Sequence, residues 1–271
     1  MQTSLEESAM FKTARKLLSQ NFLWSRELVG RLIRDSSISQ NDVVLEIGPG
    51  YGIITEQLLA VCKKLTAVEI DQRFVPFLKR KFSMLPSFHL VSNDFLANPL
   101  PPSEPFKIFS NIPFSITGEI VKKLLFAKNP PVDSYLVVQK EAAEKFIANK
   151  CRNTMLAILF YPWFNVRVVH EFEKKDFKPV PRINSSLMRL EMRSSPLLSK
   201  SLESSYRDFI VYRFGRERLA SVVSPFEWLA RFDGFIKKRD PRMLNRIRGS
   251  FTLWQAEERK LSKIHRTRTG A

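Results

Sequence analysis

Cysteines, histidines and long apolar runs are scarce in this chain of 271 residues. The two cysteines, Cys62 and Cys151, lie far apart without the spacing of a metal site, so we expect free thiols in a reducing compartment. The 3 histidines are too scattered to suggest a metal. No apolar run approaches the roughly 20 residues that span a bilayer, and the first residues lack the apolar core of a secretory signal. These absences favour a cytoplasmic globular protein that needs no metal.

Positive charge is in clear excess. The chain has 44 Lys and Arg against 27 Asp and Glu, a formal net charge of +17. Residues 181–271 hold 20 of the basic and 9 of the acidic residues, so this last third contributes +11. Such an excess favours a polyanionic partner, either a nucleic acid or an anionic membrane surface.

Apolar runs alternate with amphipathic segments over the first 190 residues. This alternation predicts a doubly wound, mostly parallel α/β sheet of the Rossmann-like kind. We expect strands at 43–47, 65–70, 88–91, 106–110, 135–139, 164–172 and 187–192, the last as an edge strand, and helices at 5–18, 25–34, 53–60, 73–82, 116–126, 141–148 and 154–160.

The character of the chain changes near Ser194. Beyond it no strand is predicted, and helical runs at 202–214, 225–232 and 251–260 are interleaved with Lys and Arg. We therefore expect a catalytic domain over residues 1–193 and a smaller, all-helical, basic domain over residues 194–271, with Arg and Lys side chains that bind phosphates. The basic candidates are Arg207, Arg213, Arg216, Lys237, Lys238, Arg239, Arg246 and Arg248.

A glycine-rich segment, residues 48–52, follows the first predicted strand. Its glycines, Gly48, Gly50 and Gly52, let the backbone approach a ligand closely at the start of a helix. The spacing differs from the dinucleotide fingerprint, so it suits a ligand with a carboxylate and an amine better than a pyrophosphate.

Acids lie at the end of the second predicted strand and just after the third. Glu69 can accept both hydroxyls of a ribose, and Asp94 can accept from an adenine amino group while Phe95 packs on the ring. Taken singly, each acid is equally consistent with a solvated strand end. Together with the glycine loop they predict a crevice for an adenosine-containing cofactor.

The fourth feature is the segment Asn111-Ile112-Pro113-Phe114. The Asn111 amide offers an acceptor and a donor, Pro113 removes a competing N–H, and Phe114 offers a face for stacking. By itself such a segment is commonly a plain strand-to-helix connection. Beside an adenosine-binding crevice it can grip an amino group and its ring.

These motifs resemble, as a set and in order, those of the S-adenosylmethionine-dependent rRNA adenine N6-dimethyltransferases. The resemblance runs from about Phe11 to Leu190. It is carried by Ser19–Leu23, Glu46–Gly52, Glu69–Asp71, Asn93-Asp94, Asn111–Phe114 and Phe177–Ser186. Asn-Ile-Pro followed by an aromatic, and the Asn184-Ser185-Ser186 ending, look more like the Erm branch, which methylates 23S rRNA, than the KsgA branch, which methylates small-subunit rRNA. Phe114 stands where Tyr is the commoner residue.

The resemblance implies S-adenosyl-L-methionine as cofactor and S-adenosyl-L-homocysteine as product. It places Asn21 and Leu23 over the methionine end of the cofactor, with Gly48 and Gly50 beneath it. Glu69 and Ile70 would hold the ribose side, and Asp94 and Phe95 the adenine. Asn111, Ile112, Pro113 and Phe114 would hold the target base, and Asn111 would also contact the cofactor. Phe177 and the loop of Pro179 and Pro181 would form another wall of the base pocket, although these residues are equally consistent with a linker stiffened by prolines. We expect a monomer acting on protein-free or partly assembled large-subunit rRNA and conferring macrolide–lincosamide–streptogramin B resistance.

Other functions remain open. A KsgA-type enzyme would dimethylate adjacent adenosines of small-subunit rRNA. A non-catalytic RNA-binding relative would keep the fold, although the intact Asn111 segment argues against it. A dehydrogenase is a distant third.

Overall fold

The computed structural model describes residues 21–150, 152–238 and 240–268, with side chains to residue 260. The helix predicted at 5–18 lies outside these ranges. The chain forms two compact units, the first from the described residues up to Ala143 together with Arg167–Met192, and the second from Glu144–Val166 together with the residues from Arg193 onward. The second unit thus includes a segment, 144–166, that we had expected in the first domain.

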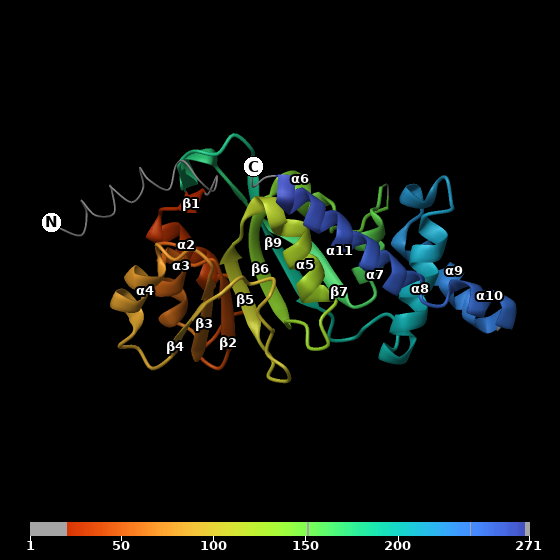
Figure 1. Cartoon of the computed structure of the whole chain (residues 1–271), viewed down its shortest axis with the longest axis horizontal. Helices are drawn as coiled ribbons and strands as arrows, with labels where there is room; N and C mark the ends of the chain where they lie inside the picture. Colours follow the sequence, from red (N-terminus) through yellow and green to blue (C-terminus); the bar gives the residue numbers. More distant parts are fainter. Residues whose placement is uncertain (1–20, 151, 239, 269–271) are drawn as a thin grey trace. The chain divides into compact units, whose positions relative to one another are not determined.

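A seven-stranded sheet, in the order β4-β3-β2-β5-β6-β9-β7, runs through the first unit (Figure 1). Five of its six neighbouring pairs are β4 with β3, β3 with β2, β2 with β5 and β5 with β6, all parallel, and β6 with β9, which is antiparallel. The strands are β2 (Val43–Ile47), β3 (Lys64–Glu69), β4 (Phe88–Ser92), β5 (Lys107–Asn111), β6 (Asp133–Gln139), β7 (Phe164–Phe172) and β9 (Ser185–Met192). The predicted doubly wound, mostly parallel α/β sheet is confirmed.

The strand order reverses between β2 and β5. From β2 the chain moves outward through β3 to β4, then returns to place β5 on the other side of β2. At such a switch point the loops leave the carboxyl ends of two neighbouring strands in opposite directions, which opens a crevice. The glycine loop follows β2, and Asn111 is the last residue of β5.

The prediction of β9 as an edge strand is wrong. β9 pairs with β6 on one side and neighbours β7 on the other, so β7 has the edge position. The alternation of Arg189 and Glu191 misled the prediction, because the Arg189 side chain is only 16% exposed and pairs with the buried Asp133 of β6 at 2.6 Å. Arg189 also pairs with Glu191 at 2.8 Å, so these polar residues of β9 form ion pairs within the sheet rather than a solvated edge.

Helices cover the sheet with apolar faces. α2 buries Val29, Leu32 and Ile33, and α3 buries Ile54 and Leu58 in one cluster with side chains of the sheet. Ser25 caps α2 as predicted, because its side chain accepts from the N–H of Leu28. The helices of this part of the chain are α2 (Arg26–Arg34), α3 (Ile53–Leu59), α4 (Val75–Phe82) and α5 (Thr117–Leu125), with 3₁₀ turns η1 (Phe114–Ile116) and η2 (Lys174–Asp176).

A short antiparallel ribbon lies outside the main sheet. β1 (Phe22–Leu23) pairs with β8 (Phe177–Lys178), Phe22 opposite Lys178 and Leu23 opposite Phe177. Two-residue strands give no periodicity, so the sequence did not predict this ribbon. It joins a segment from the start of the described chain to one just before β9.

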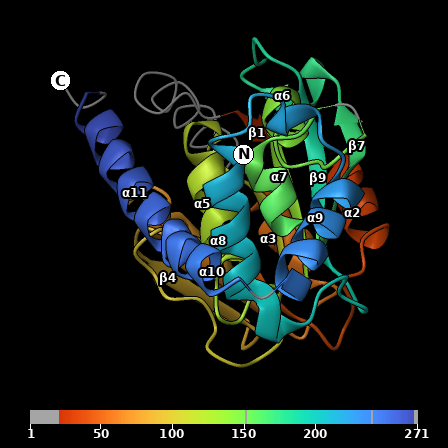
Figure 2. The same cartoon turned by 90° about the vertical axis from the view of Figure 1, so that its right-hand side faces the viewer.

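The second unit is mainly helical (Figure 2). α8 packs against α7, α9, α10 and α11, and Tyr206, Trp228 and Phe232 are fully buried within the unit. The elements are α6 (Lys140–Glu144), which spans the boundary between the units, α7 (Met155–Phe160), η3 (Lys200–Leu202), α8 (Glu203–Phe214), η4 (Ala220–Val222), α9 (Pro225–Lys238), α10 (Pro241–Ile247) and α11 (Ser250–Arg268). No helix within the described residues is long and apolar enough to cross a membrane.

Asp208 connects two of these helices. Its carboxylate oxygens accept from the N–H groups of Gly249 and Phe251, at 3.0 and 2.9 Å. Gly249 directly precedes α11 and Phe251 belongs to its first turn, where backbone N–H groups have no partner within the helix. A side chain of α8 therefore caps α11.

Candidate active site

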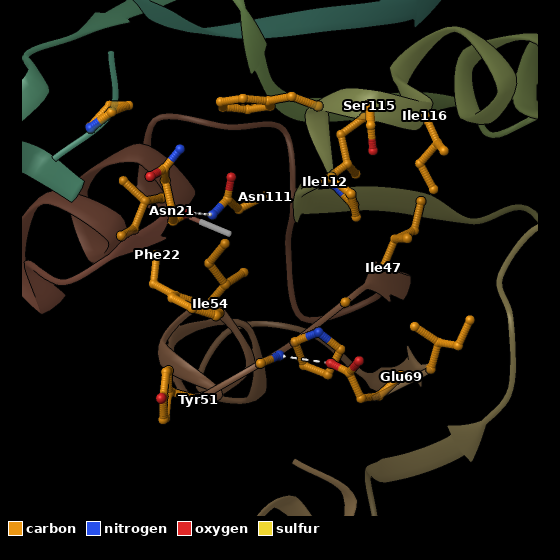
Figure 3. A pocket seen from close by; sticks show the side chains of 18 of the residues that line it. Asn21, Phe22, Ile47, Tyr51, Ile54, Glu69, Asn111, Ile112, Ser115 and Ile116 are labelled. Atoms are coloured by element: carbon orange, nitrogen blue, oxygen red, sulfur yellow. Dashed lines mark hydrogen bonds between the residues drawn. The ribbon is translucent and has the colours of Figure 1, made fainter. Parts of the chain in front are cut away.

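A pocket of about 770 Å³ lies in the first unit, at the carboxyl ends of β2, β3, β5 and β6 (Figure 3). Every site residue predicted from the sequence lines it. These residues are Asn21, Leu23, Gly48, Gly50, Glu69, Ile70, Asp94, Phe95, Asn111, Ile112, Pro113 and Phe114. The residues chosen from the sequence are therefore neighbours in the fold, and the role of each residue stays a prediction.

The glycine loop bounds the pocket beneath the switch point. Gly48, Gly50 and Gly52 have φ of 66°, 54° and 73°, a left-handed conformation that L side chains rarely adopt. A Cβ at Gly50 would lie 2.8 Å from Phe22, and one at Gly52 would lie 2.6 Å from Phe82. A Cβ at Gly48 would meet no protein atom within 4 Å. The backbone at Gly48 therefore borders open space where a ligand can approach it.

Glu69 connects the glycine loop to the end of β3. Its Oε2 accepts from Gly50 N–H at 3.0 Å and its Oε1 from Asp71 N–H at 2.8 Å. Burial raises the pKa of the Glu69 carboxyl, while these two backbone donors act in the opposite direction. The carboxylate oxygens keep further lone pairs, so Glu69 can still accept from hydroxyl groups in the pocket.

Glu46 lies behind the loop and does not line the pocket. It is 1% exposed, and its Oε2 accepts from the Thr55 hydroxyl of α3 at 2.7 Å. Burial raises the pKa of the Glu46 carboxyl to about 8, and the charge of nearby Glu69 acts in the same direction. The Thr55 hydrogen bonds oppose the shift. Glu46 thus fixes α3 against β2 from inside the protein.

Asp94 and Phe95 form the wall after β4. One Asp94 oxygen, Oδ1, accepts from Leu96 N–H at 2.8 Å, which orients the carboxylate. Phe95 is 5% exposed, and the Lys123 ammonium lies 4.8 Å from its ring centre while donating to the Phe95 carbonyl at 2.6 Å. Burial lowers the pKa of Lys123, and the Asp94 charge opposes that shift. Asp94 is therefore a fixed acceptor beside an anchored aromatic residue.

Asn111 ends β5 and turns toward β1. Its Nδ2 donates to the backbone carbonyl of Asn21 at 2.8 Å, and Figure 3 shows the two residues facing each other. With the amide nitrogen used in this way, the side-chain carbonyl Oδ1 is left as an acceptor. The hydrogen bond therefore determines which polar group Asn111 presents to a ligand.

The chain then turns tightly from β5 into α5. Pro113 has φ −61° and ψ 123°, and the following 3₁₀ turn is closed by a hydrogen bond from Thr117 Oγ1 to the Phe114 carbonyl at 3.1 Å. Ile112 is 2% exposed, whereas Phe114 is half-buried. The buried Ile112 side chain holds this turn in place, and Phe114 remains partly accessible on it.

Several lining residues were not predicted. Phe22 packs edge-on against Tyr51 at 4.9 Å, and Gln139 ends β6 next to Asn111's strand. Gln139 could have been found from its place at a strand end, but the aromatic contacts depend on packing alone. Residues 179–183 also line the pocket, which agrees with the wall expected of the Pro179 and Pro181 loop. Phe177, which we had placed with them, is instead 1% exposed within the hydrophobic core.

Some of the basic residues expected to bind phosphates are engaged inside the second unit. Arg207 pairs with Glu203, and burial lowers the pKa of its guanidinium. Arg213 pairs with Glu217 at 2.7 Å and Lys237 with Asp233 at 2.7 Å. Arg207, whose side chain is only 14% exposed, is therefore structural rather than a surface cation. Arg239 lies outside the described residues.

Comparison with known proteins agrees with this geometry. A family model described as ribosomal RNA adenine dimethylase matches residues 11–220. The chain is 33% identical over 209 residues to a ribosomal RNA small subunit methyltransferase A of Prosthecochloris aestuarii, covering 75% of this chain and 78% of that one. It is 30% identical over 258 residues to an rRNA adenine N-6-methyltransferase of Saccharopolyspora erythraea, covering 84% and 67%.

A solved structure is similar as well. The crystal structure of the 23S rRNA methyltransferase ErmE matches with a TM-score of 0.69 at 29% identity, covering 79% of this chain and 98% of that one. The match of the family model over most of the chain, and the strand-end residues gathered in one pocket, lead to the same conclusion. The chain belongs to the ribosomal RNA adenine dimethylase family.

Proposed function

We propose that the protein transfers methyl groups from S-adenosyl-L-methionine to N6 of a specific adenosine in 23S rRNA. The observation that carries the proposal is the Asn111 amide, whose nitrogen is held by the Asn21 carbonyl so that Oδ1 faces a ligand as an acceptor. An exocyclic amino group is the donor that matches such an acceptor.

The pocket residues suit S-adenosyl-L-methionine. The open backbone at Gly48 and the neighbouring Asn21 and Leu23 would border its methionine end. Glu69 would accept from its ribose hydroxyls, with Ile70 packed beside them, and Asp94 from its adenine amino group. When bound, the cofactor supplies a methyl group on a positively charged sulfur. The product would be S-adenosyl-L-homocysteine, and no cluster of three or more metal-ligand residues occurs among the described residues.

The remaining chemistry belongs to the Asn111–Phe114 segment. Asn111 Oδ1 and the Ile112 carbonyl accept the two N–H groups of adenine N6, which directs its lone pair toward the methyl and stabilises the positive charge that develops there. Once methylated, N6 is acidic and releases one of these protons to solvent, so no strong general base is required. Phe114 holds the ring by stacking, worth about 1–3 kcal/mol per base. Holding the reacting atoms in line is the main catalytic effect. The base must leave any stack to reach this position, so a looped or bulged adenosine is the expected target.

The choice of 23S rRNA rests on the motif residues. Ile112 within the Asn111 segment and the Asn184-Ser185-Ser186 ending favour the Erm branch. Relatives of both branches match the chain, so KsgA-type methylation of small-subunit rRNA is the second candidate. We further propose a cytoplasmic monomer that acts on protein-free or partly assembled large-subunit rRNA and confers macrolide–lincosamide–streptogramin B resistance.

Mass mapping of methylated adenosines in rRNA from cells that express the chain tests the proposal. We expect a mono- or dimethylated adenosine in 23S rRNA and a raised inhibitory concentration of a macrolide. An Asn111→Ala strain is the control and should lack both. Methylation confined to 16S rRNA would replace the proposal with the KsgA-type function, and rRNA without new methylation would exclude both.

A further inference from the structure

Trp24 is a large aromatic side chain held at the surface. It follows the pocket-lining residue Leu23, and it is 48% exposed. Its indole Nε1 donates to the Lys175 carbonyl at 2.6 Å, and its backbone N–H to the Asp176 carbonyl. The ring is thus fixed in orientation while nearly half of it meets solvent. By contrast, Trp163 and Trp228 are buried, at 6% and 0% exposure.

Trp24 shares a ribbon face with the pocket. Lys178 is paired across the ribbon with Phe22, which lines the pocket, and its ammonium lies 3.9 Å from the Trp24 ring centre. Trp24, which directly follows β1, therefore lies on the same side of the ribbon as Phe22 and Lys178. The opposite face carries Leu23 and Phe177 into the core. This face therefore extends from the pocket outward to Trp24.

The next residues alternate along the same rim. Lys178, Val180 and Arg182 are exposed, Val180 by 64%, while Pro179 and Pro181 are more enclosed. We call Trp24, Lys178, Val180 and Arg182 the rim patch.

The rim patch keeps its positive charge. No ion pair involves Lys178 or Arg182 among the residues that the structure describes. The two acids nearest in sequence are already engaged, since Glu173 pairs with Lys175 at 2.8 Å and Asp176 accepts from the Glu173 N–H at 2.8 Å. These two cations match the anionic phosphate of a nucleotide, and the phosphate would draw the Lys178 ammonium off the Trp24 ring, which frees that face for the base to stack.

We propose that the rim patch binds a nucleotide next to the target adenosine, with its base stacked on Trp24 and its phosphate held by Lys178 and Arg182. The inference rests on the proposed function, because it requires a single-stranded RNA whose target base occupies the neighbouring pocket. A base lifted from its stack leaves its neighbour unstacked, and Trp24 replaces the lost stacking partner. The contacts to phosphate position the strand without reading its sequence.

Steady-state methylation of protein-free 23S rRNA tests the rim patch. Trp24→Ala should raise KM for RNA about 10- to 100-fold, the loss expected for one stacked base. The kcat should stay within about threefold, since Trp24 does not touch the reacting atoms. Lys178→Ala should raise KM by a smaller factor of about 3- to 10-fold, as for one phosphate contact. Lys64→Ala, an exposed lysine at the amino end of β3, and Phe226→Ala, a 63% exposed aromatic in the second unit, are controls that should leave KM unchanged.

Tryptophan fluorescence provides a readout that does not depend on methylation. Adding single-stranded RNA should quench the tryptophan fluorescence of the wild-type protein, and the Trp24→Phe variant should lose most of that quenching. A polyphosphate of matched charge should bind without the quenching, which separates stacking from charge alone. Equal quenching by polyphosphate, or an unchanged KM in Trp24→Ala, overturns the rim patch. If the wild type methylates no rRNA while RNA still quenches Trp24, the proposed function fails, and the rim patch is retained only as a site for single-stranded RNA without a target adenosine.

Discussion

Asn111 has two polar groups, and one of them is used within the protein. The bond from Nδ2 to the Asn21 carbonyl crosses from β5 to the residue just before β1. A rotated amide would place two oxygens together, so this bond selects the orientation with Oδ1 toward the pocket. In the proposed reaction the side chain would thereby be oriented before the substrate arrives, which would reduce the reorganisation needed in the transition state.

Replacing Asn111 by Ala should lower kcat by about 10²- to 10³-fold, the usual loss for one acceptor or donor placed at developing charge. Because the backbone of β5 is unaffected, the thermal midpoint should change little. Methyl transfer from labelled S-adenosyl-L-methionine to 23S rRNA measures the effect. Asn165→Ala, at an exposed position of β7, is the matched control and should keep kcat within about twofold. An Asn111→Ala enzyme with wild-type kcat would remove this residue from the mechanism.

Glu46 should make stability depend on pH. Its pKa is raised from an ordinary 4.5 to about 8, so the folded protein keeps a proton that the unfolded chain releases between these values. Stability should therefore fall as the pH rises through this window, by an amount on the order of 1–3 kcal/mol. Glu46→Gln keeps a neutral hydrogen-bonding group and should flatten this decline. Urea unfolding at pH 6 and pH 8.5 measures this decline in the free energy of unfolding. Glu27→Gln, at an exposed position of α2, is the control and should leave the decline unchanged.

At the residue scale, strand ends were the informative positions. Glu69, Asp94 and Asn111 could be predicted because the carboxyl ends of parallel strands meet at one edge of the sheet. The contact of Phe22 with Tyr51 could not be predicted from the sequence, because it depends on how the ribbon folds back over the glycine loop. Phe177 was misplaced for the same reason, since its neighbours line the pocket while its own ring points into the core.

At the scale of elements, long periodic segments were predicted well and short ones were missed. β2 and β7 agree with the predicted bounds, and α9 continues six residues past its predicted end at Phe232. The ribbon of β1 and β8 and the helix α10 have too few residues to show a period. The neighbours of β9 also could not be predicted, because strand order is decided by tertiary packing rather than by the pattern within the strand.

The capping of α11 by Asp208 should support the second unit. Asp208→Ala removes the acceptor for Gly249 and Phe251 and should lower the free energy of unfolding by about 1–2 kcal/mol, as for other N-caps. Binding of S-adenosyl-L-methionine, measured by calorimetry, should remain, because the pocket lies in the first unit. Asp233→Ala, an exposed acid on α9, should cost less than about 0.5 kcal/mol. Equal losses in the two variants would contradict the capping role.

For the whole molecule, charge is the dominant property. The formal charge of +17 implies that RNA binding releases many counterions. Raising the salt concentration from about 50 to 200 mM should weaken RNA binding at least about 100-fold, as measured by filter binding. Affinity for S-adenosyl-L-methionine should change by less than about threefold under the same conditions, since few charges are involved. A salt-independent RNA affinity would mean that the excess charge serves another purpose.

The pairing of Phe22 with Lys178 has a consequence for synthesis of the chain. A nascent chain emerges from the ribosome amino end first, and domains generally fold as units once their residues are available. The residues of the glycine loop and the strand ends leave the ribosome early. The ribbon over them forms only after Phe177 and Lys178 have been made, and β6 pairs with β9 only after residues 185–192 have been made. The site is therefore completed late, after most of the first unit has left the ribosome exit tunnel. The nascent chain of this proposed rRNA methyltransferase would thus lack a complete site while it is still attached to the translating ribosome.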